Sequence, residues 1–593
     1  MEKRFKKLAA LGLAGALAAT TILTGCGSSG SGSSSGEDMT SFTWLVDKQI
    51  QAGFYDNWSE NAAFNYFQSM EWDADGDGEP ASLSFELISP VAGAEKDNVN
   101  TLVATGEYPD IMSMSYVSTP ISELYEDGLI LDLTEYVDKY MPNYKAWMEA
   151  NPSLKKQMVN TIDGEEKILQ IYGVQDVQSP NFGGYLYRRD WIVKYGTNPE
   201  TGEAFTGGYE GDDWYDDVVF PSGNTDPIYI SDWEWMFEIF ETAMDDLGID
   251  DGYCFQIYYP GYVQLGDFST GFGGINPLWY TDDDNNVQFG ATSDEFRAYV
   301  ECMNAWYEKG WVDQQFDERS SDIFFNIDSA SVYSGKVGAW YAGNGQFGNG
   351  LASGDDSDTA ALSGICVWGA PQPINDVYGS DSAKGIEPAS YYAKSQIGAG
   401  TVLTNKCENK DIADLLTAID YLYSYEGGLL YSYGLSDELQ AEINDDFYNE
   451  QGLENGGYTM EDQGDGLKPT VNTLYDTVEY LGYMCQLPVG VGLYIYDANY
   501  GYTNIKSHGY DMWTLYQDTA TIPSTVSGQM DADQSATYNQ INTSINTEMA
   551  QYIGDFITGR TNVNDDSAWK TYTDAINSYE PEKVTEIYSS LMN

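Results

Sequence analysis

The stretch Ala94–Met114, AEKDNVNTLVATGEYPDIMSM, places a helix pattern directly before a strand pattern. Apolar residues recur at helical spacing over Ala94–Thr105, and Gly106 stands where a left-handed residue commonly ends a helix. A short apolar run, Ile111–Met114, follows after one turn and is typical of a buried strand. The stretch therefore predicts a helix that leads straight into a buried strand.

The chain before this stretch predicts two further strands and one further helix. Apolar and polar residues alternate over 42–46 and again over 83–87, as in half-buried strands. The segment Glu60–Ser69 between them has the apolar spacing of a helix. An order of strand, helix, strand, helix, strand favours a parallel sheet with right-handed crossovers.

Later segments continue the mixed α/β pattern. The run Ser231-Asp-Trp-Glu234 is a capping box that predicts the start of a helix, which Gly248 ends. A second capping box, Thr292-Ser-Asp-Glu295, opens a helix that Gly310 ends. Further expected elements are strands at Val337–Trp340 and Gly400–Leu403 and helices at Ile412–Leu422, Glu548–Thr558, Ser567–Ser578 and Glu582–Met592.

Length and composition indicate a folded, acidic protein with more than one lobe. A chain of 593 residues exceeds what one hydrophobic core usually serves, so we expect at least two lobes. The formal net charge of −66 excludes nucleic acid as a partner, because phosphate binding needs a basic surface. The same charge disfavours anionic lipid surfaces and strongly anionic ligands. Aromatic residues make up 14% of the chain, which argues against disorder.

Histidine and cysteine usage limits the chemistry. The single histidine, His508, leaves little room for His-based triads or metal sites. Catalysis by a pair of carboxylates stays open, because the chain has 93 acidic residues. Beyond Cys26 there are five cysteines without CxxC spacing, and one or two disulfides remain open.

The N-terminus has the pattern of an export signal. Basic residues precede an apolar run, Leu8–Leu23, and Leu23-Thr24-Gly25-Cys26 resembles a bacterial lipobox. We expect residues 1–25 to be a signal peptide, Cys26 to be lipidated, and 26–39 to be a Gly/Ser-rich tether. The competing interpretation is a transmembrane anchor in which Cys26 is incidental. No later apolar run approaches the ~18 residues of a membrane span.

Several short motifs occur in an order that resembles one family. They are Thr101–Ile111, Glu126-Asp-Gly-Leu-Ile-Leu-Asp-Leu-Thr134, Met141-Pro-Asn143, Leu186-Tyr-Arg-Arg-Asp-Trp191, Tyr307-Glu-Lys-Gly-Trp311, Ser334-Gly-Lys-Val-Gly338 and Asn409-Lys-Asp-Ile412. In this order the chain resembles the extracellular solute-binding proteins, family 1, of carbohydrate ABC transporters, in their large lipoprotein (LipO/LplA-like) form. Segments 202–227 and 436–503 do not match the pattern, and ligand loops are where such families differ.

The resemblance implies a periplasmic-binding-protein-like α/β fold. It has two α/β lobes, joined by a multi-strand hinge of two or three crossing strands, with a ligand cleft between them. On this basis we expect residues 40–168 with 325–400 to form lobe 1. Residues 169–324 with 401–593 are then expected to form lobe 2.

Aromatic residues near the expected cleft are the candidate ligand contacts. Tyr and Trp rings stack on the apolar faces of sugars, while their polar tips bind hydroxyl groups. Because the resemblance implies contacts at strand ends, it points to Trp44, Trp58, Asp110, Tyr116, Trp279, Trp340 and Tyr341. The competing interpretation of each aromatic residue is core packing. Asp190, after two arginines, is expected to form an ion pair rather than a ligand contact.

One acidic loop has the spacing of a calcium site. Asp73, Asp75 and Asp77 alternate and Gly78 follows, as at the start of an EF-hand loop. The twelfth position is Ser84 instead of Glu, so Glu79 or Glu86 would have to supply the missing ligand. An ordinary acidic turn is the alternative. We therefore expect no required cofactor and, at most, a structural calcium ion.

The expected function is binding without catalysis. We expect a monomeric, lipid-anchored protein on the outer side of the cell membrane. It captures an oligosaccharide, a neutral one on the charge argument, and delivers it to the permease of an ABC importer. Two alternatives remain: a secreted glycoside hydrolase that acts through a carboxylate pair, and a peptide- or lipid-binding importer component of the same architecture.

Overall fold

The structure is a computed structural model. It describes residues 39–50, 55–76, 78–162, 164–176, 183–205, 218–257, 268–282, 284–318, 328–343, 366–389, 396–462, 466–471, 485–495, 512–516 and 530–592. The expected signal peptide, Cys26, Asp77, His508 and all of the tether except Met39 lie outside the described residues. No helix of the described part is both long and apolar enough to cross a bilayer.

A six-stranded sheet forms the centre of the first unit. Its order is β18-β8-β15-β5-β1-β4, with bounds β1 Ser41–Leu45, β4 Ser84–Ile88, β5 Ile111–Ser113, β8 Ile171–Gln175, β15 Ile397–Leu403 and β18 Gly492–Tyr494. Strand β1 pairs in parallel with both β4 and β5, which confirms the parallel start predicted from the sequence. Strand β15 runs antiparallel to its neighbours β5 and β8.

Helices and small ribbons cover this sheet. The helices are α2 Ala62–Gln68, α3 Glu95–Thr105, α4 Ile121–Glu126, α5 Thr134–Tyr140, α6 Pro142–Ala150, α7 Pro152–Lys155, α13 Ile412–Tyr421, α14 Tyr425–Tyr433, α15 Asp437–Ile443 and α16 Asp446–Gln451, with short 3-10 turns at Trp58–Glu60 and Asn405–Cys407. The ribbons pair β2 Glu71–Trp72 with β3 Ala81–Ser82, β6 Asn160–Ile162 with β7 Glu165–Lys167, and β16 Tyr458–Asp462 with β17 Leu467–Val471.

A four-stranded sheet forms the centre of the second unit. Its order is β10-β13-β9-β14, with bounds β9 Gly183–Arg188, β10 Tyr253–Phe255, β13 Val337–Gly343 and β14 Val367–Ala370. Strand β9 runs antiparallel to β13 and β14, while β10 and β13 are parallel. A ribbon of β11 Trp279–Thr281 and β12 Val287–Phe289 lies apart from this sheet.

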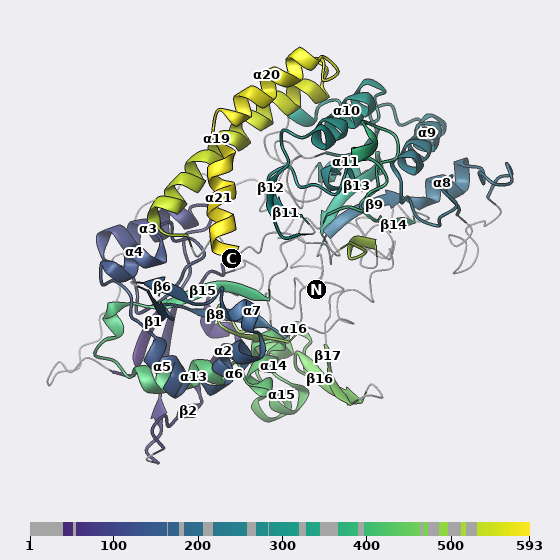
Figure 1. The fold of residues 1–593 in the computed structure, drawn as a ribbon. Coiled ribbons are helices and arrows are strands. Elements are labelled where there is room, and N and C mark those ends of the chain that lie inside the picture. The colour runs from purple at the N-terminus through teal and green to yellow at the C-terminus, as the bar shows by residue number, and fades with distance from the viewer. Residues whose placement is uncertain are drawn as a thin grey trace, which may run out of the picture.

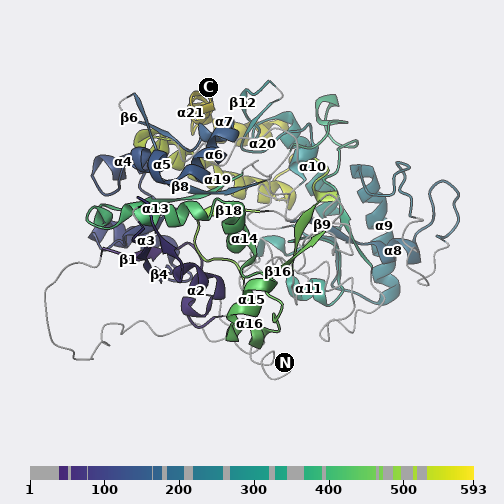
Figure 2. The same ribbon diagram turned by 90° about the horizontal axis from the view of Figure 1, so that it is seen from below.

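The C-terminal helices belong to the second unit. Its helices are α8 Arg189–Tyr195, α9 Ile230–Leu247, α10 Asp294–Glu308, α11 Ser329–Tyr333, α19 Ala532–Ile557, α20 Asp566–Asn577 and α21 Pro581–Met592, with 3-10 turns at Ser269–Gly271, Phe316–Glu318 and Asp381–Ala383. Apolar side chains of α19 and α20, among them Ile545, Phe556 and Trp569, join the core that also holds α9 and α10. Figure 1 shows α20 and the adjoining end of α19, in yellow, beside α10, and Figure 2 shows the same ribbon from below.

The chain passes between the two units three times, and each time it leaves a sheet at one of the same two edges. It leaves the carboxyl end of β8 and reaches the amino end of β9. It returns from the carboxyl end of β14 to the amino end of β15, and passes again from β18 toward α19. Because β9 and β15 oppose their neighbours, the carboxyl ends of β1, β5, β8 and β18 lie on the edge turned toward the second unit. The carboxyl ends of β10, β13 and β14 lie on the corresponding edge of the second unit. We call these two the facing edges.

The strand pairing corrects the expected lobe boundaries. Residues 325–400 were assigned to lobe 1, yet their strands β13 and β14 pair with β9 in the second sheet. Residues 169–175 and 401–495 were assigned to lobe 2, yet they supply β8, β18 and the apolar side chains of α13 and α14 to the first unit. The third passage, which follows β18 and which no local pattern in the sequence marks, accounts for the second of these errors.

Most local signals near helix ends are confirmed, but the predicted start of α9 is wrong. Gly106 and Gly248 adopt φ values of 74° and 68° as left-handed caps. Helix α9, however, begins at Ile230, and Asp232 rather than Glu234 closes its capping box by accepting from the Tyr229 N–H. The hydroxyl of Ser231 instead donates to Asp376.

The cysteines of the described part form no disulfide. All five are free thiols, and four of them are buried. Burial raises the pKa of the Cys485 thiol to about 12, as expected for a small core residue that stays protonated.

Candidate functional site

Polar side chains gather at the facing edge of the first unit. Asp47 follows β1, and its Oδ2 accepts a hydrogen bond of 3.2 Å from the Ser115 hydroxyl, just beyond β5. The Ser115 hydroxyl lies 3.1 Å from that of Ser113 at the end of the strand. A Cβ at Gly490 would lie 3.7 Å from Asp47 Oδ1, so bare backbone borders the carboxylate. The edge therefore offers a carboxylate and two hydroxyls side by side.

Lys48 connects this edge to the loop before β18. Its ammonium group donates to Gln486 Oε1 at 3.3 Å and to the Leu487 carbonyl at 3.5 Å. Burial lowers the pKa of Lys48, and the negative charge of Asp47 opposes this shift. Because both acceptors are neutral, Lys48 acts mainly to hold the loop in place.

Aromatic side chains cover the facing edge of the second unit. Tyr341 lies near the end of β13, with its ring edge-on to Tyr185 at 5.5 Å between centroids. Trp513, from the third passage, donates its indole N–H to the Tyr185 carbonyl at 3.0 Å. A Cβ at Gly184 would lie 2.2 Å from the Trp513 ring, so only glycine allows this contact. Trp513 thus ties the third passage to the start of β9.

Three of the predicted ligand residues lie at the facing edges. Trp58 is 8% exposed and donates its indole N–H to Ser89 Oγ, which follows β4, at 2.9 Å. Tyr116 follows β5 and is half-buried; burial and the charges of Glu95 and Asp47 raise its pKa. Tyr341 is 4% exposed and, like Trp58, packs in a hydrophobic core. Their role in ligand binding stays a prediction.

Three other predicted residues are also core side chains, and their assignment as ligand contacts stays a prediction. Trp44 is 0% exposed in the first core. Trp340 is 1% exposed, and it points to the opposite face of the sheet from its neighbour Tyr341, because side chains alternate along a strand. Trp279 donates to the Pro581 carbonyl at 3.3 Å, beneath the C-terminal helices. The large apolar surface of an aromatic ring suits a hydrophobic core as well as stacking on a sugar, and these three rings pack in the cores.

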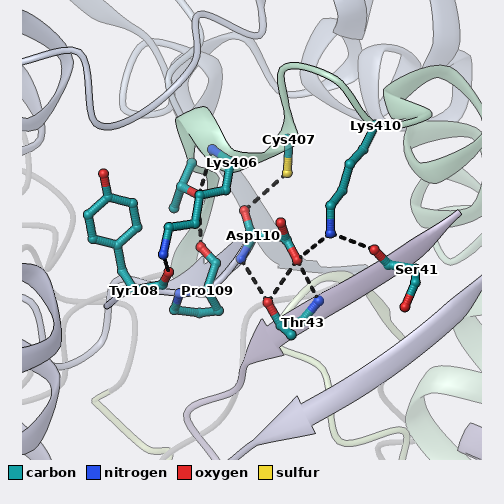
Figure 3. Close-up of polar contacts among 9 residues, drawn as sticks. Ser41, Thr43, Tyr108, Pro109, Asp110, Lys406, Cys407 and Lys410 are labelled. Atoms are coloured by element: carbon teal, nitrogen blue, oxygen red, sulfur yellow. Dashed lines mark hydrogen bonds and ion pairs between the residues drawn. The ribbon is translucent and has the colours of Figure 1, made fainter. Parts of the chain in front are cut away.

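Asp110 lies at the edge opposite the facing edge. Its Oδ2 accepts from the backbone N–H and the hydroxyl of Thr43, both at 2.8 Å, and from the Lys410 ammonium at 2.8 Å (Figure 3). Lys410 also donates to the Ser41 carbonyl. The Thr404 hydroxyl donates to the Pro109 carbonyl at 2.7 Å. The Pro-Asp-Ile motif therefore joins β1, β5 and the segment after β15.

Replacing Asp110 is expected to cost stability and to leave ligand affinity intact. In Asp110→Ala the half-buried Lys410 ammonium and the Thr43 N–H lose their acceptor, and breaking such a pair costs about 3 kcal/mol. Urea denaturation followed by tryptophan fluorescence measures the loss. Asp127→Ala, at an exposed carboxylate of the same unit, is the control and should change the unfolding free energy by less than about 0.5 kcal/mol. A variant that keeps its stability but loses ligand binding would show Asp110 to be a ligand residue after all.

Asp190 forms the expected ion pair. Its two carboxylate oxygens accept from Arg188 Nε at 2.9 Å and Nη2 at 2.7 Å. The guanidinium group also lies 4.5 Å from the Trp191 ring centroid. Both charged side chains are more than nine-tenths buried, so the pair fixes the junction of β9 and α8.

The acidic loop after β2 is an ordered turn. The two carboxylate oxygens of Asp73 accept from the backbone N–H groups of Gly76 and Gly78 at 2.8 and 3.0 Å. No three acidic, histidine or cysteine side chains of the described residues gather closely enough to hold a metal ion. Asp77, the third residue of the expected set, lies outside the described residues, so structural calcium stays a prediction.

If the loop binds calcium, the ion should stabilise the folded state by mass action. We expect millimolar calcium to raise Tm and EGTA to reverse the rise. Asp75→Asn should abolish the effect, because it removes a carboxylate ligand, whereas Asp284→Asn in another exposed turn should preserve it. A Tm that calcium does not change in the unmodified protein identifies the loop as an ordinary acidic turn.

A pocket of about 790 Å³ lies elsewhere on the first unit. It opens among α5, α6 and α7, next to Ile168, which precedes the amino end of β8. Its lining combines apolar side chains with lysines and acids. The pocket therefore lies at the end of the first sheet that is opposite its facing edge.

Solved structures similar to this chain share one fold. An extracellular solute-binding protein from Bifidobacterium longum subsp. infantis is 14% identical, with a TM-score of 0.64 over 94% of this chain and 99% of that one. The S. pneumoniae ABC-transporter substrate-binding protein FusA, as an EF-hand mutant, is 15% identical, with a TM-score of 0.62 over 93% and 98%. The alginate-binding protein AlgQ2 is 14% identical, with a TM-score of 0.60 over 94% and 98%.

These likenesses confirm the predicted fold class. The chain has a periplasmic-binding-protein-like α/β fold, as extracellular solute-binding proteins do. No protein-family model and no curated protein matches the sequence.

Proposed function

We propose that this protein captures an oligosaccharide between its facing edges and delivers it unchanged to the permease of an ABC importer. The observation that carries the proposal is the arrangement of the three passages, which bring two polar and aromatic edges opposite each other. The S. pneumoniae protein FusA, to which this chain is similar with TM-scores of 0.61 and 0.62, is known in complex with kestose and with fructo-nystose, which supports a sugar as the ligand.

The charge of the chain supports a neutral sugar. A net charge of −66 creates a negative potential that lowers the local concentration of anionic ligands. At the first facing edge, Asp47 adds a carboxylate, and the nearby cation Lys48 is engaged with the loop before β18. Hydroxyl groups, which both donate and accept hydrogen bonds, suit the side chains present there.

Delivery would use closure of the two units. A ligand that contacts both facing edges binds the closed arrangement more tightly than the open one, and so shifts the population toward closure. The permease can then recognise the closed form. No bond of the ligand is made or broken, so the protein acts by affinity alone.

A ligand panel tests the proposed function. Neutral oligosaccharides, kestose included, should raise Tm, because a ligand at about 100 times its Kd stabilises the folded state by about 2.7 kcal/mol. Peptides of similar size should not. Chromatography of the bound sugar should return it uncleaved. Stabilisation by peptides alone, or hydrolysis of the sugar, would overturn the proposal.

The lipid anchor is proposed from the lipobox at Cys26. In Cys26→Ala the lipid has no thiol to attach to, so we expect the protein to leave the membrane fraction. Fractionation of cells and mass spectrometry of the mature N-terminus measure this, with Ser28→Ala as the control. Full retention of the Cys26→Ala protein in membranes would favour the transmembrane-anchor interpretation.

A further inference from the structure

Two neighbouring segments of the second unit hold buried polar atoms without a hydrogen-bond partner. Thr270 is 0% exposed, and within the described part its hydroxyl has no partner. The same holds for Oε1 of Gln372, whose side chain is otherwise half-buried. Natural proteins satisfy nearly all buried polar groups, so each exception needs an explanation.

These two residues lie on adjacent segments. A Cβ at Gly271, next to Thr270, would lie 1.9 Å from the carbonyl of Pro373, which follows Gln372. The Asn375 N–H donates to the Gly271 carbonyl at 2.9 Å, so the segments run side by side. Gln372 comes two residues after β14, and this places the pair at the second facing edge.

The first facing edge carries a matching group. Gln49 follows β1 by four residues, and its Nε2 is also buried without a partner in the described part. Indole N–H groups of Trp44 and Trp340 lack partners too, but both rings are packed in cores. Thr270, Gln372 and Gln49 instead lie in connecting segments outside the strands of the two sheets.

We infer that Thr270 and Gln372 form a subsite for a hydroxyl group of the ligand, which Gln49 meets from the first unit on closure. This rests on the proposed function and adds to it the kind of sugar group that is recognised. Oε1 of Gln372 can only accept a hydrogen bond, and Nε2 of Gln49 can only donate one. A sugar hydroxyl does both, whereas an ionised carboxylate or sulfate cannot donate to Gln372. The subsite therefore selects a neutral sugar unit.

A pair of threonine substitutions tests the subsite. Thr270→Val removes a hydroxyl that has no partner, so Tm of the unliganded protein should stay equal or rise, while Kd for the oligosaccharide should increase about tenfold. Thr404→Val is the matched control. Thr404 is 1% exposed and its hydroxyl is bonded to Pro109 at the opposite edge, so Tm should fall while Kd stays unchanged.

Gln372→Leu gives a second, independent measurement. It keeps a side chain of similar size, removes the acceptor, and should weaken binding of kestose, or of the panel sugar that binds best, by at least tenfold. Isothermal titration calorimetry measures Kd, and differential scanning calorimetry measures Tm. The unmodified protein should also bind the neutral sugar more tightly than its uronic acid derivative.

The outcomes separate the two proposals. If the unmodified protein binds sugar and both variants bind it equally well, the subsite is wrong and the proposed function stands. If Thr270→Val loses as much stability as Thr404→Val, the Thr270 hydroxyl has a partner and the subsite is wrong. If no neutral sugar binds the unmodified protein, both proposals fall together.

Discussion

The direction of two strands governs the arrangement of this protein. Strand β9 in the second sheet and β15 in the first run against their neighbours. Each therefore begins at the edge where the neighbouring strands end. The passages that lead from β8 to β9 and from β14 to β15 can then leave and enter at the same two edges. Had β9 or β15 run parallel to its neighbours, a passage would have had to cross the full height of a sheet. Antiparallel pairing thus sets the facing edges opposite each other.

The two edges of the first sheet differ in how their polar groups are satisfied. At the amino edge, Asp110, Thr43 and Lys410 bond one another, so this edge is fixed. At the facing edges, Gln49 and Gln372 keep buried amide atoms without partners in the described part. A fully bonded cluster adds rigidity, whereas a buried polar atom without a partner is energetically costly. The contrast separates a fully bonded supporting edge from the facing edges, where we propose that the ligand binds.

Local elements were predictable because their signals are local. The left-handed glycine after α3 and the apolar spacing of α13 depend on residues within a few turns. The predicted start of α9 was wrong because the Ser231 hydroxyl does not cap the helix. It donates instead to Asp376, which is distant in sequence. Candidate aromatics were harder to place, since ring area favours a core and a sugar face equally. Trp44 lies in the core and Tyr116 lies at the facing edge, and no sequence pattern around either residue predicts this difference.

The amino-acid sequence alone determined the α/β class, the acidic character that argues against nucleic acid, and the first parallel strands, because these follow from composition and short-range periodicity. Only the tertiary structure decided which segments share a sheet, that the chain passes between the units a third time after β18, and that Asp110 supports the fold instead of facing a ligand. Strand pairing joins residues hundreds of positions apart, as Tyr172 and Gly400 show. The packing of the whole core selects this strand pairing, so no single stretch of the sequence predicts it.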